Sequence, residues 1–213
     1  MTVKVTKPAV NLREELTSLR NQGGYQEQQF YFDSLVTNGD FASDTNWTKG
    51  TGWTISGGVA TCDGTQTTST DLIQTNDLTD GVTYAVTYTV SGYTAGSVYG
   101  WINGNLLTAR SANGTFTDYI NLTGVNASIG LRAVSTFAGS IDNISIYKAD
   151  ANDDVIHTMP KGWKPKDFYE DGLLQREGAA HDYEVIYDGF DYVIKPTVAP
   201  SATTQTCVIG VKA

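Results

Sequence analysis

The sequence predicts an all-β protein. It has 213 residues, of which 22 are glycine and 12 are tyrosine, whereas only 17% are charged. Tyrosine favours strands and glycine favours turns, so this composition is typical of β-structure with an uncharged surface rather than of helices. Several stretches also alternate between apolar and polar residues, with Asp-Gly or Asn-Gly pairs between them, which is the pattern of antiparallel strands joined by tight turns.

Residues 1–34 are predicted to form an N-terminal arm that contains one short helix. Asn11 is a suitable N-cap, and Gly23 ends the helix. A helix of about ten residues is marginally stable alone in water, so it has to pack on the rest of the chain or on another protein. One stripe of this helix is apolar and carries Leu12, Leu16 and Leu19.

The end of the arm is aromatic. Residues 25–32 begin with a run rich in glutamine and finish in Phe30, Tyr31 and Phe32. Two roles fit this stretch: a strand that covers an open edge of the next domain, or an anchoring segment that inserts into a neighbouring subunit. An arm of about 30 residues is longer than edge covering normally requires, so both roles stay open.

Residues 35–148 are predicted to form a β-sandwich. In the stretch from Tyr84 to Val90, tyrosine and valine side chains share one face, whereas alanine and threonine share the other. Such a period of two predicts that one face is buried and the other faces water.

The remainder of the chain is predicted to be a linker, residues 149–165, and a small β-module, residues 166–213. Two hairpins are expected in the module, with turns at Asp171 and Asp188, each followed by glycine. A last strand is expected at 207–211. About 60 residues of β-structure are stable only marginally unless they dock on another body.

Charge and hydropathy narrow the classes of partner. The net charge of −9 disfavours nucleic acid and anionic membranes as partners. Met1–Val10 lacks the apolar run of a signal peptide, and no segment approaches the roughly 20 apolar residues of a membrane span, so we expect assembly in a cytoplasm. Cys62 and Cys207 have no CxxC or histidine pairing nearby, so neither a zinc site nor a disulfide framework is predicted.

Residues suited to catalysis are scarce. The two histidines, His157 and His181, lie near no Gly-x-Ser-x-Gly sequence and near no plausible acid partner. The acidic residues concentrate in the linker and the turns, where solvation explains them better than paired catalysis does. We therefore expect a protein that is not an enzyme.

Residues 97–102 place two aromatic side chains on one face of a strand. Val98 and Ile102 share one side, whereas Tyr99 and Trp101 share the other. If the first pair is core, Tyr99 and Trp101 are displayed, and exposed aromatics suit either glycan stacking or a protein interface. The alternative is the reverse parity with Trp101 in the core, because tryptophan is usually largely buried.

A set of residues in the middle domain carries a family resemblance, which covers about half the chain. The set comprises Asn38-Gly39-Asp40-Phe41, Trp47, Trp53, Gly57-Gly58, Gln74, Gly81 to Tyr84, Gly114-Thr115-Phe116 and Gly139 to Ile144. It resembles the family 4/9-like carbohydrate-binding modules, which implies a jelly-roll sandwich. A fold of this kind does not determine a function.

The resemblance also implies a structural calcium ion near the first and last strands of the module. Asn38 and Asp40 correspond to its oxygen donors, beside Asp142. Asp142 shares strand parity with Ile144, so its carboxylate is expected on the buried side, where an unpaired charge would be costly. Ala42 stands where the family often has an acidic ligand. A hydrogen bond between Asp142 and the opening loop is the alternative.

Both flanks resemble parts of bacteriophage virion proteins. A short β-module of such proteins is similar to Asp171 to Gln175, Gly178, Asp182 to Val185, Ala199-Pro200 and Val208 to Val211, and the start of small phage structural proteins is similar to Lys7 to Arg13. The resemblance implies a structural protein of a tailed bacteriophage virion: a capsid decoration or cement protein, or a short head fibre, that forms a homotrimer. Its arm would anchor on the major capsid protein or on other virion proteins through Leu12, Leu16, Leu19, Phe30, Tyr31 and Phe32.

Two other functions remain open. A tail fibre or adhesin would bind host surface glycans through the sandwich, with Tyr99 and Trp101 as the platform. An accessory carbohydrate-binding module of a secreted polysaccharidase is the third, which the missing signal and missing catalytic domain disfavour.

Overall fold

The structure is a computed structural model. It describes residues 27–124, 128–150, 155–170, 173–175, 177–178, 182–187, 189, 191–198 and 206–212, with the side chains of residues 27–31 and 135 left out. The predicted helix with Leu12, Leu16 and Leu19 lies outside these residues, as do the two turns at Asp171 and Asp188.

Every regular element of the described residues is a strand, so the prediction of an all-β protein is confirmed. Among these residues there is no helix, and so none that is long and apolar enough to cross a membrane. The strands are β1 (Glu27–Tyr31), β2 (Thr48–Lys49), β3 (Trp53–Ser56), β4 (Val59–Asp63), β5 (Thr70–Thr75), β6 (Thr83–Ile102), β7 (Asn105–Arg110), β8 (Gly114–Asn121), β9 (Ser128–Ala149), β10 (His157–Thr158), β11 (Trp163–Glu170), β12 (Leu173–Leu174), β13 (Tyr183–Tyr187), β14 (Tyr192–Pro196) and β15 (Thr206–Lys212).

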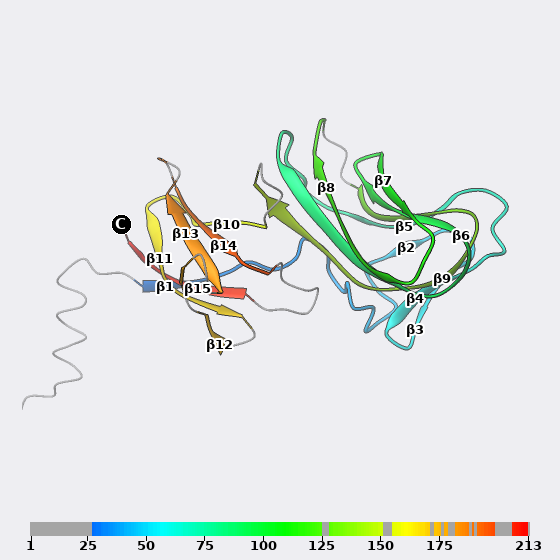
Figure 1. Cartoon of the computed structure of the whole chain (residues 1–213), viewed down its shortest axis with the longest axis horizontal. Helices are drawn as coiled ribbons and strands as arrows, with labels where there is room; N and C mark the ends of the chain where they lie inside the picture. Colours follow the sequence, from blue (N-terminus) through cyan, green and yellow to red (C-terminus); the bar gives the residue numbers. More distant parts are fainter. Residues whose placement is uncertain are drawn as a thin grey trace, which may run out of the picture.

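Strands β2 to β9 form one sheet of eight strands, the large sheet, which curls until it is nearly closed (Figure 1). Its centre is the antiparallel pair of β6 and β9, which have 20 and 22 residues. The first half of β6 pairs with β8 and its second half with β7, while β9 pairs with β5 and then with β4. The sheet curls because β6 and β9 each run through both of its halves and pair with a different strand in each half. A jelly-roll order of strands stays a prediction.

The core of the large sheet follows the predicted alternation in β6. Tyr84, Val86, Tyr88 and Val90 are at most 1% exposed. On the opposite face the threonines of β6 pair with threonines of β8 through hydroxyl hydrogen bonds of 2.9 Å. Ala85 departs from the pattern, since it is buried against Tyr147 and Val155 where the C-terminal part of the chain covers the sheet.

The corner of the large sheet depends on residues with left-handed backbone. Gly92 and Gly96 of β6 have φ angles of 57° and 70°, and Thr136 of β9 has a φ of 66°. The pairing of β6 with β9 shifts register on both sides of Ala95. These positions allow two continuous strands to bend sharply and enclose the core.

Two smaller sheets, built from β1 and β10 to β15, form the C-terminal module. One has the order β1-β15-β11-β12 and the other the order β10-β14-β13. Both predicted hairpins are confirmed, because β12 pairs with β11 and β14 pairs with β13, each antiparallel. Strand β15 confirms the expected last strand. The linker expected at residues 149–165 holds β10 and the start of β11.

The N-terminal strand β1 belongs to the C-terminal module. It pairs antiparallel with β15, with Glu27 opposite Val211 and Tyr31 opposite Cys207. It does cover a sheet edge, although the edge is that of β15 and not of the large sheet. The chain therefore crosses from the module to the large sheet after Phe32 and returns after β9 (Figure 1).

Candidate functional site

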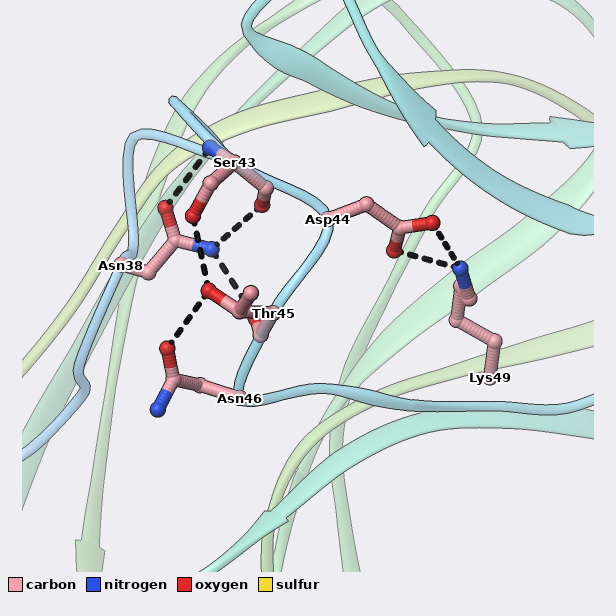
Figure 2. A network of polar contacts seen from close by, with 6 residues as sticks. All are labelled: Asn38, Ser43, Asp44, Thr45, Asn46 and Lys49. Carbon is pink, nitrogen blue, oxygen red and sulfur yellow. Dashed lines mark hydrogen bonds and ion pairs between the residues drawn. The ribbon is translucent and has the colours of Figure 1, made fainter.

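The loop before β2, residues 38–46, is held together by the side chain of Asn38 (Figure 2). Its amide nitrogen donates to the backbone oxygens of Ser43 and Thr45 at 2.7 and 3.0 Å, and its amide oxygen accepts from the Ser43 N–H at 3.2 Å. The indole N–H of Trp47 donates to the backbone carbonyl of Asn38 at 3.0 Å. Both polar atoms of this predicted metal ligand thus organise the loop itself.

Asp142 does not share the parity of Ile144, because a β-bulge separates them. In the pairing with β6, strand β9 has one extra residue at this point, and Asn143 has a left-handed φ of 52°. The expected burial of the Asp142 carboxylate is therefore wrong, since the bulge leaves it partly exposed. It accepts hydrogen bonds from the backbone N–H and the side-chain amide of Asn143, at 2.6 and 3.1 Å.

The loop of residues 38–46 is hydrogen-bonded to β9 through its backbone. The Ile144 N–H donates to the Gly39 carbonyl at 2.9 Å, and the Asp40 carboxylate accepts from the Ala42 N–H at 3.3 Å. Within the described part of the chain, no three His, Cys, Asp or Glu side chains form a group able to hold a metal ion. A calcium site formed by Asn38, Asp40 and Asp142 stays a prediction.

Tyr99 and Trp101 lie on the outer face of the large sheet, each partly exposed, while Val98 and Ile102 are fully buried. Cross-strand pairing sets Tyr99 beside Arg132 of β9, and Arg132 in turn beside Asp71 of β5. The parity of the expected aromatic face is therefore the one observed.

Arg132 forms the centre of this outer cluster. Its Nε and Nη2 donate to the two carboxylate oxygens of Asp71 at 2.6 and 2.8 Å, and its pKa is raised chiefly by these hydrogen bonds. Its guanidinium carbon lies 3.8 Å from the centroid of the Trp101 ring, in cation–π geometry. A sugar that stacks on Trp101 has to use the other ring face or displace Arg132. Arginine, tryptophan and tyrosine together are instead the side chains enriched at the centres of protein interfaces.

A second polar cluster lies at the seam between β7 and β8, which both pair with β6 but, among the described residues, not with each other. Arg110 of β7 donates to Asp118 of β8 at 2.5 Å, and its guanidinium lies 4.7 Å from the Phe116 ring centroid. The two side chains are 20% and 9% exposed. Arg110 Nε and Asp118 Oδ2 are buried without a hydrogen-bond partner among the described residues. Burial, and then the Asp118 carboxylate, raise the pKa of nearby Tyr88 to about 12.

The Arg110–Asp118 pair was not anticipated from the sequence, although a signal for it exists. Phe116, Asp118 and Ile120 alternate on the inner face of β8, so a charged residue stands between two apolar ones. A carboxylate at an inward position needs a cationic partner. The partner comes from β7, which the sequence alone does not place opposite β8.

His157 lies at the junction between the large sheet and the C-terminal module. Its ring stacks on Phe32 with centroids 5.0 Å apart, and it contacts Tyr147 and Phe168 at 6.0 and 6.1 Å. It is 3% exposed, beside a cleft of about 280 Å³. Burial lowers its pKa from 6.5 to about 4, so the imidazole is neutral in the folded protein near neutral pH. Its position is that of a packing residue. The other histidine, His181, lies outside the described residues.

We expect stability to fall when the pH is lowered from about 7.5 to about 5. The unfolded chain binds a proton at His157 near pH 6.5 and the folded chain only near pH 4, so protonation favours unfolding between these values. Urea unfolding followed by tryptophan fluorescence should show a loss of about 2 kcal/mol. His157→Phe keeps the ring stack and should lose most of this pH dependence, whereas an unchanged slope in that variant would assign the effect to other groups.

The three clusters lie in different parts of the chain: the outer face around Arg132, the seam at Arg110, and the buried junction at His157. Only the outer cluster combines exposure with charged and aromatic groups, which makes it the best candidate for recognition by another molecule. Comparisons of the sequence with models of known protein families and with curated proteins give no match.

Proposed function

We propose that this chain is a non-enzymatic structural protein of a tailed bacteriophage particle, either a capsid decoration or cement protein or a short head fibre. In this proposal the N-terminal arm and the C-terminal module attach to the major capsid protein or another virion protein. The large sheet is displayed outward. A homotrimer is the proposed oligomer.

The observation that carries the proposal is the position of β1 beside β15. Residue Glu27 lies opposite Val211, so the segment before β1 leaves the module next to the end of β15. Both strands lie at one end of the molecule, and the large sheet lies at the other (Figure 1). A body attached through its N-terminal arm at this end would hold the large sheet away from the surface that it binds.

Exposed apolar side chains support attachment through the C-terminal module. Large hydrophobic residues that are well exposed are typical of interaction surfaces when several lie on one small body. Seven such residues occur among the described ones, and two of them, Leu106 and Tyr119, belong to the large sheet. The other five belong to the module: Leu173, Leu174, Ile186, Tyr187 and Val198.

The glycan-binding alternative depends on Tyr99 and Trp101. Arg132 covers one face of the Trp101 ring and is held there by Asp71. The arrangement therefore suits a protein interface better than a sugar platform, which needs a free aromatic face.

Binding of full-length variants to particles stripped of this protein tests the proposal. We expect a triple variant with serine in place of Leu12, Leu16 and Leu19 to lose particle binding, because the predicted apolar stripe would no longer pack on a neighbour. The matched control is Trp101→Ala, which changes the displayed face and should keep its attachment to the particle.

Two results would contradict the proposal. One is full decoration by the triple serine variant, and the other is absence of the protein from purified particles by mass spectrometry. If Trp101→Ala instead loses binding to host glycans while the triple variant retains it, the adhesin function is favoured. Copy number in the particle separates an abundant cement protein from a scarce tail component.

A further inference from the structure

Strand β13 is an open edge of the C-terminal module. It ends the three-stranded sheet β10-β14-β13, and its other side carries only an isolated parallel bridge, between Glu177 and Tyr183, among the described residues. Beyond this bridge the side chains of Ile186 and Tyr187 are 41% and 58% exposed. An open edge of this kind is a template for the addition of another strand.

The backbone groups of two residues in β13 point toward the open side. The Tyr183 carbonyl accepts from the Gly178 N–H at 2.7 Å, so it is directed away from β14. The residue of β14 that lies opposite Tyr183 is Pro196, which has no N–H to donate. Alternate residues of a strand direct their backbone groups to the same side, so those of Val185 and Tyr187 also point away from β14. Each of the two offers one N–H and one carbonyl.

A groove of about 300 Å³ runs beside this edge. Its lining consists of Glu177, Gly178, Glu184, Val185 and Ile186, so both charged residues are acidic. Burial raises the pKa of Tyr183, and the nearby carboxylates of Glu177 and Asp167 raise it further, in agreement with a negative environment. Lys195 lies opposite Glu184, but its ammonium group is also 3.7 Å from a carboxylate oxygen of Asp150.

The two faces of β13 differ in chemistry. Tyr183, Val185 and Tyr187 share one face, whereas Glu184 and Ile186 share the other. A strand added to this edge therefore meets only apolar and tyrosine side chains on one face, and the carboxylate of Glu184 beside Ile186 on the other. A second copy of β13 would bring another Glu184 to the groove, in a chain that already carries a net charge of −9. Like charges at this position disfavour self-pairing.

We infer that the open edge of β13 binds an extended, basic segment of another protein by strand addition. Lysine or arginine side chains of that segment lie beside Glu184, and alternate apolar side chains lie beside Val185 and Tyr187. Main-chain hydrogen bonds hold the segment, and its basic residues provide selectivity. The inference concerns the C-terminal module alone, so it holds whether or not the chain is part of a virion.

Two synthetic peptides test this, one of alternating valine and lysine and one of alternating valine and glutamate. Titration calorimetry with the full-length protein should show that the lysine peptide binds at least about tenfold more tightly, because only it complements the carboxylate of Glu184. Hydrogen exchange followed by NMR should show that the Val185 and Tyr187 amides exchange rapidly in the free protein and become protected with the peptide.

Val185→Pro removes an outward N–H without removing a bond to β14, so it should weaken peptide binding at least about tenfold in a folded protein. Glu184→Lys provides an independent variant, which should reverse the preference between the two peptides. Equal binding of both peptides, or no binding, overturns the inference. Protection of the two amides in the free monomer would assign the edge to the chain's own segments, and protection that grows with protein concentration would assign it to a second copy; either result overturns the inference as well.

Discussion

Asp118→Ala is expected to destabilise the protein by about 3 kcal/mol, or roughly 10 °C in Tm. The substitution leaves the guanidinium of Arg110 at the seam without its carboxylate partner, while its side chain is only 20% exposed. Loss of one member of a largely buried ion pair costs more than the pair contributes, because the remaining charge is separated from water. Thermal unfolding followed by circular dichroism measures the effect.

The chain offers a matched control for this variant. Asp71→Ala breaks a second aspartate–arginine pair of the same sheet, whose side chains are 30% and 27% exposed. We expect a loss of about 1 kcal/mol or less there, because water screens the pair and solvates Arg132 after the change. Equal losses in the two variants would show that burial at the seam does not determine the cost. Joint replacement of Arg110 and Asp118 by methionine and leucine should be close to neutral.

Gly96→Ala is expected to destabilise the protein by at least about 3 kcal/mol, or to prevent folding. Its φ of 70° is unfavourable for a residue with a side chain, and a Cβ at this position would lie 2.3 Å from the backbone nitrogen of Phe137. The corner of the large sheet would have to open, because the obstacle is the backbone of β9 rather than a flexible side chain. Chemical unfolding and the yield of folded protein report the effect.

Gly92→Ala separates the two causes of this cost. Gly92 lies four residues away in the same strand with a φ of 57°, but no atom comes within 4 Å of the Cβ position. Only the backbone strain remains, so a loss of about 1 kcal/mol is expected. A cost as large as that of Gly96→Ala would contradict the proposed role of the close contact between β6 and β9.

The regular strands were predictable because their alternation is local. Tyr84 to Val90 and the two hairpins of the module were expected from period-two patterns and Asp-Gly pairs, and the structure has them as β6, β11 with β12, and β13 with β14. The same alternation predicted that Tyr99 and Trp101 share one side of the strand and that Val98 and Ile102 share the other, and the structure places the first pair outside. In each case a residue's side of the sheet follows from its immediate neighbours in the sequence.

Predictions failed where one residue interrupts the alternation. Asn143 inserts a bulge into β9, and this single position moves Asp142 from the expected buried side to a partly exposed one. The strand continues on both sides of the bulge, so composition and propensity do not reveal it. Ala85 was expected to face water and is buried, because Val155 from a distant part of the chain covers it.

The sequence by itself determined that the chain is all-β, where several of its strands lie, and which side chains from Tyr84 to Val90 enter the core. Tertiary structure alone decided that β1 pairs with β15 rather than with the large sheet, and that Arg110 meets Asp118 across the seam. The physical reason is the difference in sequence separation over which these effects act. Alternation and turn chemistry act over a few residues, whereas pairings between strands separated by much of the chain depend on which backbone edges and charges remain unsatisfied after the sheets form.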